Sequence, residues 1–228
     1  MTLKLLTPIE ARVLATLMEK ARTVPDSYPL SMNALVIGCS QKTSREPLMD
    51  VTAEQARTAI DSLKSQSLVF EASSSRVSRF EHNYQRASGM SEPESVVIGL
   101  LMLRGAQTPA ELRTNGERWY KFPDVEAVEA VLKALQERGD NGGQASVQLL
   151  PKMPNAREQR WTHLLCGAPD LEALKLGFQG MGAAGQSSEL LSRLTALENT
   201  SARLQADNAR LREQILFISE QLGIALPD

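Results

Sequence analysis

The chain has 228 residues, of which 42% are hydrophobic and 4% aromatic, and its formal net charge is −2. This length allows one large domain or two small ones with an appendage, and the aromatic-poor composition is typical of helical proteins. The charge argues against a protein that binds polyanions over its whole surface. No apolar run is long enough for a membrane span, and the two cysteines lie far apart. We therefore expect a cytoplasmic protein with no membrane association, disulfide framework or metal site.

Two stretches about eighty residues apart follow the same pattern. Residues 7–10 and 91–94 each place a Ser or Thr three positions before a Glu, which is the capping box of a helix start. An apolar stripe at helical spacing follows each box: Val13, Leu14, Leu17 and Met18 in the first stretch, and Val97, Ile98, Leu101 and Met102 in the second. A repeat of this length indicates a duplicated domain.

In the first repeat we expect a helix over residues 7–21, a short apolar helix capped by Ser31, and a third helix that starts at Thr52. A strand at residues 68–70 and a returning strand at residues 77–84 follow. Three helices and then a hairpin is the order of a winged helix-turn-helix.

The second repeat has the same order of predicted elements. Its first helix spans residues 91–104, and a second begins near Thr108. A third helix starts at Asp124, and Gly139 is expected to stop it. A hairpin of residues 145–150 and 160–165 ends the repeat.

We therefore predict a mainly α fold with small β-hairpins (α+β), built from tandem winged helix-turn-helix domains at residues 1–88 and 89–167. Residues 168–188 are glycine-rich, so we expect a linker there. Residues 189–224 are expected to form a C-terminal coiled-coil helix.

Apolar residues recur every seven positions near the C-terminus, and alternate positions complete a 4-3 repeat over more than four heptads. The residues that we expect at a dimer interface are Leu190, Leu194, Leu197, Leu204, Asn208, Leu211, Ile215, Ile218 and Leu222. One Asn at a core position is best satisfied by its symmetry mate in a parallel two-stranded coil, so we predict a homodimer. The alternative is an amphipathic helix that folds back onto its own domain.

Several longer motifs resemble the YceH family of uncharacterised bacterial proteins. They lie at residues 6–20, 28–31, 39–47, 103–113 and 157–164, and the match covers residues 5–167 and extends into the heptad segment. Ser40 stands where we expect Asn in that family. The resemblance implies tandem winged-helix domains in a bacterial cytoplasmic protein, and it supplies no activity.

We expect no enzymatic activity and no cofactor. His82 and His163 lie near the ends of predicted strands, and neither has a nucleophile or a second metal ligand at suitable spacing. A histidine that is hydrogen-bonded to the backbone is the favoured interpretation of both. The sequence also lacks a phosphate-binding glycine loop and a nucleophile elbow.

Winged helices bind double-stranded DNA by placing the third helix in the major groove and the hairpin against the backbone. The basic residues that we expect to contact DNA are Lys42, Arg45, Arg57, Lys64, Arg76 and Arg79 in the first repeat, and Lys152, Arg157 and Arg160 in the second. The third helix of the second repeat is mainly acidic, so a duplex would repel it. Only the wing of that repeat is therefore a candidate for DNA contact.

A scaffold that binds other proteins, without DNA binding, is the competing interpretation, because winged helices also serve as docking modules. The acidic third helix of the second repeat and the long heptad segment fit this interpretation. We favour DNA binding because the basic residues of the first repeat occur together on the loop, the third helix and the wing. The aromatic residues Trp119, Tyr120, Phe122 and Trp161 are expected in the core of the second repeat and not at a nucleic-acid surface.

Overall fold

Seven α-helices and two small antiparallel sheets make up the described residues of the computed structural model, which are 4–72, 77–140, 145–152 and 157–169. The helices are α1 (Pro8–Thr23), α2 (Met32–Cys39), α3 (Ala53–Ser65), α4 (Tyr84–Ser88), α5 (Glu92–Arg104), α6 (Pro109–Gly116) and α7 (Val125–Asp140), with a 3₁₀ turn η1 (Pro25–Ser27). The strands are β1 (Leu30–Ser31), β2 (Val69–Ala72), β3 (Arg79–His82), β4 (Val147–Leu149) and β5 (Trp161–His163). This mixture confirms the predicted α+β class. The predicted coiled coil and nearly all of the predicted linker lie outside the described residues.

The helices begin where the capping residues predict. At the start of α1, Thr7 Oγ1 accepts from the Glu10 backbone N–H at 3.2 Å, and the Glu10 carboxylate accepts from the Thr7 N–H at 2.6 Å. Thr52 and Thr108 form equivalent capping boxes before α3 and α6, and Ser31 caps α2. Each box satisfies backbone N–H groups that a helix start otherwise leaves without a partner.

In both sheets the second strand of the hairpin is the central one. The first sheet has the order β1-β3-β2, with Leu30 opposite Phe80 and Val69 opposite His82. In the second sheet β4 pairs with β5, and an isolated bridge joins Gln107 to Trp161 on the side that β1 occupies in the first. The two halves of the described chain therefore repeat one arrangement of three helices and a small sheet.

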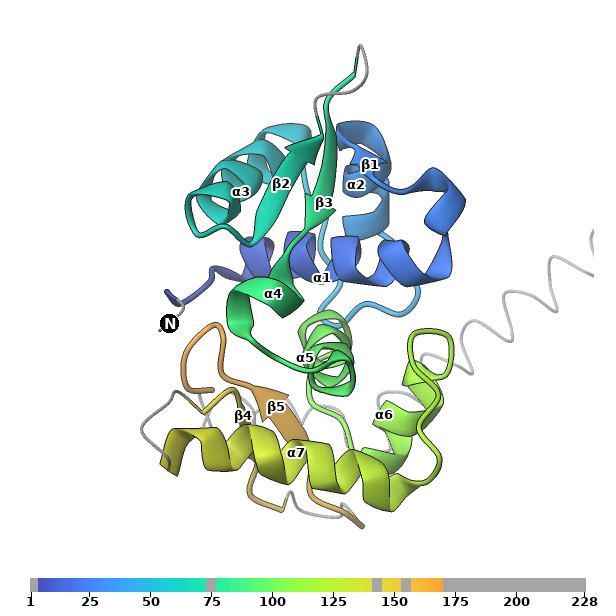
Figure 1. The fold of residues 1–228 in the computed structure, drawn as a ribbon, viewed down its shortest axis with the longest axis vertical. Helices are drawn as coiled ribbons and strands as arrows, with labels where there is room; N and C mark the ends of the chain where they lie inside the picture. Colours follow the sequence, from blue (N-terminus) through green and yellow to red (C-terminus); the bar gives the residue numbers. More distant parts are fainter. Residues whose placement is uncertain (1–3, 73–76, 141–144, 153–156, 170–228) are drawn as a thin grey trace, which may run out of the picture. The chain divides into compact units, whose positions relative to one another are not determined.

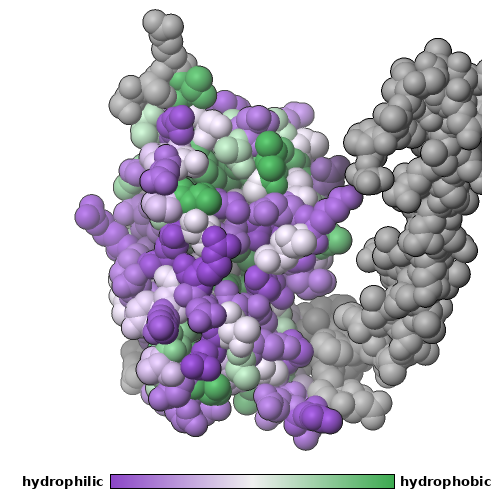
Figure 2. All heavy atoms as spheres, turned by 90° about the vertical axis from the view of Figure 1, so that its right-hand side faces the viewer, coloured by the Kyte–Doolittle hydropathy of each residue, from purple (hydrophilic) through white to green (hydrophobic). Residues whose placement is uncertain are grey.

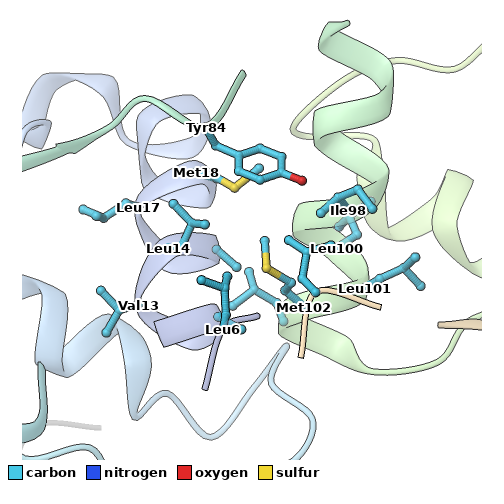
Figure 3. Packing of buried hydrophobic residues seen from close by; sticks show 14 of the residues in the cluster. Leu6, Val13, Leu14, Leu17, Met18, Tyr84, Ile98, Leu100, Leu101 and Met102 are labelled. Carbon is cyan, nitrogen blue, oxygen red and sulfur yellow. The ribbon is translucent and has the colours of Figure 1, made fainter. Parts of the chain in front are cut away.

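The two halves share one hydrophobic core, because α1 packs against α5 (Figure 1). Leu14 and Met18 of α1 lie toward Met102 of α5, with Tyr84 of α4 beside them (Figure 3). Every residue of α5 from Glu94 to Leu103 is buried, so this helix contacts apolar neighbours on all sides. The buried stripes predicted for both helices are confirmed. The sequence did not predict that α1, the first helix of the first repeat, packs on α5, the first helix of the second.

A glycine in α5 allows close contact with a large aromatic side chain. A Cβ atom on Gly99 would lie 2.7 Å from Trp119 Cζ3 and 3.2 Å from Met18 Cε. Trp119, Phe122 and Trp161 are all buried, which confirms that these aromatic residues belong to the core. A larger residue at position 99 therefore requires a shift of the Trp119 indole ring and a small adjustment of the Met18 side chain.

Several boundaries differ from the predicted ones. Residue Tyr84 begins the short helix α4, where the sequence predicted the end of a strand. Helix α7 extends to Asp140, so Gly139 does not stop it. Strand β1 was not predicted, because two residues form a strand only through their pairing with β3. No helix of the described residues is long and apolar enough to cross a lipid bilayer.

Candidate nucleic-acid interface

Helix α3 separates an apolar face from a polar one. Its buried residues, at spacings of three and four, are Ala56, Ala59, Ile60 and Leu63. Arg57 and Thr58 are exposed on the opposite face, together with the acidic residues Glu54 and Asp61. Arg57 forms no ion pair with a described residue, so its guanidinium is available to an external anion. With Lys64, the second basic residue of the helix, the polar face of α3 carries two cations and two carboxylates, and so no net charge.

The second basic residue of α3 has an internal partner. Lys64 Nζ lies 2.6 Å from Glu71 Oε2 on β2, and both side chains are about one-third exposed (37% and 32%). The pKa of the Glu71 carboxyl is lowered, chiefly by the hydrogen bond from Lys64. Lys64 therefore contributes less positive charge to the surface than its place on α3 suggested.

The loop before α3 contains one exposed cation and one buried cation. Lys42 is exposed. The side chain of Arg45 is fully buried, and its guanidinium donates to both carboxylate oxygens of Glu19. It also donates to the carbonyl oxygen of Gly38 at 3.0 Å and to Gln41 Oε1 at 2.9 Å. The prediction that Arg45 contacts DNA phosphate is therefore wrong, because all its donors are used inside the protein.

The wing of the first half contributes Arg79. This residue is exposed on β3, and its guanidinium donates to the carbonyl oxygen of Pro29 at 2.8 Å. A neutral carbonyl fixes the side chain without compensating its charge, so Arg79 remains a candidate phosphate contact. Arg76 lies outside the described residues.

In the second half, a carboxylate neutralises the charge of one of the three basic residues that were predicted to contact DNA. Lys152 and Arg157 are exposed beside the hairpin tip. Arg160 pairs with Glu111 through two hydrogen bonds of 2.6 and 2.7 Å, and it also donates to the carbonyl oxygen of Ala106. It therefore joins the hairpin to α6, and little of its charge is left for a ligand.

Helix α7 exposes mainly acidic side chains on the face away from the core. Asp124 caps the helix through its Oδ1 atom, which accepts from the Ala127 N–H at 2.8 Å. Glu126 and Glu129 are exposed, and Lys133, four positions after Glu129, is an exposed cation of the same helix. The predicted acidic character of this helix surface is confirmed.

Both histidines are half-buried and neutral at physiological pH. Burial lowers the pKa of His82 and of His163 to about 4. In both rings Nδ1 is buried and has no hydrogen-bond partner, so the expected bond from ring to backbone is not made by this atom. His82 lines an open groove of about 720 Å³ between the first sheet and α4, with Phe70 and Arg86. A neutral imidazole of this kind is a poor proton donor near pH 7.

Hydrophobic residues do not form a single large patch on the face seen in Figure 2, which is mainly hydrophilic. The large apolar side chains that are exposed among the described residues are Leu5, Val24, Ile37, Leu48, Phe70 and Val77. They come from separate elements. On the visible face, polar and charged groups therefore offer more to a ligand than apolar contacts do.

Comparison with known proteins gives consistent results over the whole chain. The family model described as "Protein of unknown function, DUF480" matches residues 6–156. A "UPF0502 protein" of Polaromonas sp. is 69% identical over all of this chain and 95% of its own length. A "UPF0502 protein" of Polaromonas naphthalenivorans is 58% identical over 87% of this chain and 94% of its own length, and one of Delftia acidovorans is 50% identical over 97% and 94%. None of these descriptions names an activity.

Proposed function

We propose the function of this chain from its structure, because it belongs to the family described as "Protein of unknown function, DUF480". Membership in this family confirms the resemblance to an uncharacterised bacterial family but brings no activity. Each half is a winged helix, and the first half binds double-stranded DNA through α3, the loop before it and the wing. The protein is a cytoplasmic, non-enzymatic DNA-binding protein of the transcription-regulator type.

The arrangement of the first half supports this proposal. Strand β1 lies between α1 and α2, and the β2–β3 hairpin follows α3 in a sheet of order β1-β3-β2. Strand β2 of this hairpin packs beside α3 (Figure 1). In winged helices the third helix enters the major groove while neighbouring segments contact phosphates. The observation that carries the proposal is the position of three exposed cations: Lys42 on the loop, Arg57 on α3 and Arg79 on the wing.

The second half fits a different role. Its third helix, α7, exposes Glu126 and Glu129, and the ion pair with Glu111 uses the charge of Arg160. Phosphate contacts dominate the affinity of proteins for duplexes, so an acidic helix is unsuited to the major groove. Lys152 and Arg157 are the remaining cations through which this half would touch a duplex.

The heptad segment supports self-association. With Asn208 at a core position, residues 189–224 are suited to a parallel two-stranded coiled coil, which would present two first halves to one duplex. Sedimentation equilibrium of the full chain is expected to give a dimer. A monomer at all concentrations would contradict this part of the proposal.

Salt-dependent binding to a fluorescent duplex of random sequence tests the DNA-binding proposal. Each phosphate contact contributes about 0.9 to the slope of log K against log salt concentration. Arg57→Ala is expected to weaken binding and reduce this slope by about one unit. Arg118→Ala, which removes an exposed cation from the second half, is the matched control and is expected to leave the slope unchanged.

A protein-interaction scaffold is the second candidate, because the exposed acidic residues of α7 are suited to a basic partner better than to a duplex. No binding of the wild-type chain to the duplex at low ionic strength would refute the DNA-binding proposal and favour the scaffold. Equal loss of binding in Arg57→Ala and Arg118→Ala would show that any DNA contact is not centred on α3.

A further inference from the structure

The connection between α2 and α3 is long for a helix-turn-helix. Helix α2 ends at Cys39 and α3 begins at Ala53, whereas the turn of such a motif is about 3–4 residues. The packing of α3 on α1 and α2 fixes the orientation of this helix, but a connection of this length takes a defined path only where other contacts hold it. We call the connecting residues 40–52 the α3 loop.

Within the first half, buried contacts hold both ends of the α3 loop. Arg12 of α1 is buried, and its guanidinium donates to the carbonyl oxygens of Cys39 at 3.1 Å and Pro47 at 2.6 Å. The Val51 N–H donates to Ser40 Oγ at 3.0 Å, which joins the end of the loop to its start. Together with the buried Arg45, these contacts fix the loop against α1.

The second half holds the middle of the same loop. The Glu46 N–H donates to the carbonyl oxygen of Leu103 at the end of α5, at 2.7 Å. The Arg104 guanidinium donates to Ser44 Oγ at 2.8 Å and to Asn115 Oδ1 of α6 at 2.9 Å. A Cβ atom on Gly105 would lie 3.4 Å from Glu46 Cγ, so Glu46 packs directly over the turn that follows α5.

The contact extends from Arg104 into the core of the second half. Asn115 Nδ2 donates to Gln107 Oε1 at 2.8 Å, and Gln107 Nε2 donates to the carbonyl oxygen of Leu100 at 3.1 Å. Gln107 also forms the bridge to Trp161 in the second sheet. The α3 loop is therefore connected to the α6 helix, the α5 helix and the second sheet of the other half.

We propose that the second half is a positioning element for DNA binding by the first. Through Leu103 and Arg104 it fixes the α3 loop, and thereby the position of the loop cation Lys42 relative to α3. This inference rests on the proposed function of the first half. It also gives the second half a role for which the acidic surface of α7 is no obstacle. Arg104 is a positioning residue and does not itself touch DNA.

Hydrogen exchange of the full chain tests the coupling without DNA. Arg104→Met removes the guanidinium and keeps an apolar side chain, and Ser44→Ala removes only the hydroxyl partner. Both variants are expected to speed exchange of the Glu46 amide by about tenfold, because a hydrogen bond to a charged group stabilises by roughly that factor. Arg113→Met is the control, since Arg113 donates to Pro123 within the second half, and it is expected to leave the loop unchanged.

Duplex binding of the same variants tests the positioning role. In Arg104→Met the affinity is expected to fall roughly three- to tenfold, because the loop must then be ordered on binding. The salt slope is expected to stay constant, because Lys42, Arg57 and Arg79 are all retained. Arg104→Lys, which keeps one charged donor, is expected to restore part of both losses.

The outcomes separate this inference from the proposed function. Unchanged exchange of the Glu46 amide in both Arg104→Met and Ser44→Ala would overturn the inference, as would faster exchange with unchanged duplex affinity. A reduced salt slope in Arg104→Met would also overturn it, because Arg104 would then be a phosphate contact. A wild-type chain that binds no duplex would refute the proposed function, and the exchange experiment would still decide whether the second half holds the α3 loop.

Discussion

Replacing Arg45 is expected to reduce stability and leave the salt dependence of DNA binding unchanged. In Arg45→Met the apolar part of the side chain is retained, while the hydrogen bonds to Glu19, Gly38 and Gln41 are lost. Glu19 then remains as a carboxylate that is only 12% exposed. We expect the free energy of unfolding to fall because this charge is buried without its main partner.

The size of the effect follows from what remains around Glu19. Removal of one partner from a buried ion pair costs about 3–5 kcal/mol. Lys20 still lies 3.2 Å from Glu19, so we expect a value toward the lower end, about 2–4 kcal/mol. For a domain of this size each kcal/mol lowers Tm by about 2–4 °C, which gives a decrease of roughly 5–15 °C.

The pH dependence gives an independent test of the same ion pair. Burial tends to raise the pKa of Glu19, but the hydrogen bond and charge of Arg45 outweigh it, and the pKa lies below its ordinary value of 4.5. The wild-type chain therefore loses this stabilisation as the pH falls through the lowered pKa. In Arg45→Met burial dominates and the pKa of Glu19 rises, so protonation in acid favours the folded state. The difference in stability between the two chains is expected to shrink from pH 7 to pH 4.

Thermal unfolding at both pH values and salt-dependent duplex binding measure these effects. Lys42→Met in the same loop is the matched control, because Lys42 is exposed. It is expected to leave Tm unchanged and to reduce the salt slope by about one unit. If Arg45→Met instead kept the wild-type Tm and reduced the salt slope, Arg45 would be a phosphate contact, and its assignment to the protein interior would be wrong.

Two further variants test the core and the first sheet. Gly99→Ala should gain about 1 kcal/mol from helix propensity but lose about 1–3 kcal/mol to its close contact with Trp119, so we expect a lower Tm. In a Trp119→Phe background the same change should become stabilising. A higher Tm in both backgrounds would contradict the close packing of Gly99 against Trp119. His82 has its pKa lowered to about 4, so the unfolded chain takes up a proton first and the wild type loses stability between about pH 6.5 and pH 4. His82→Phe should weaken this loss in chemical denaturation, and an identical pH profile would show that the ring is accessible to solvent when folded.

The elements that sequence predicts well are those with local signals. The starts of α1, α3 and α6 follow from a Thr and an acidic or amide residue three positions later, which interact within one turn. The strands are less well defined, because their ends depend on pairing with residues far away in sequence. Gln107 is the clearest example, since its bridge to Trp161 has no counterpart in the local sequence.

The sequence does contain a signal for the packing of α1 on α5, but the comparison of the two repeats draws attention away from it. Alignment of the two repeats draws attention to one apolar stripe on each helix. Residues 95–103 are almost all apolar, however, and a helix that is apolar on every side is buried on every side. That composition already indicates that the first helix of the second repeat has two neighbours.

The placement of Arg45 had no such signal. A basic residue in a polar loop is ordinarily exposed, and its partner Glu19 lies 26 positions earlier on a helix that is not adjacent in sequence. Only the fold brings the two together. The same is true of Arg160 and Glu111, which are 49 positions apart. Ion pairs between distant segments are therefore the main reason why a count of basic residues misjudges a binding surface.

The distinction matters for the strength of the proposed interaction. Residues 1–90 carry a net charge of +2 in sequence, but charge that is used internally does not contribute to phosphate binding. The exposed cations of the proposed interface that form no ion pair with a described residue are Lys42, Arg57 and Arg79. Three phosphate contacts imply a salt slope of about −2.7 for one chain, and about twice that for a dimer with both first halves engaged. A much steeper slope would require contacts from cations outside this set, and the wing of the second half, with Lys152 and Arg157, would be the first place to look for them.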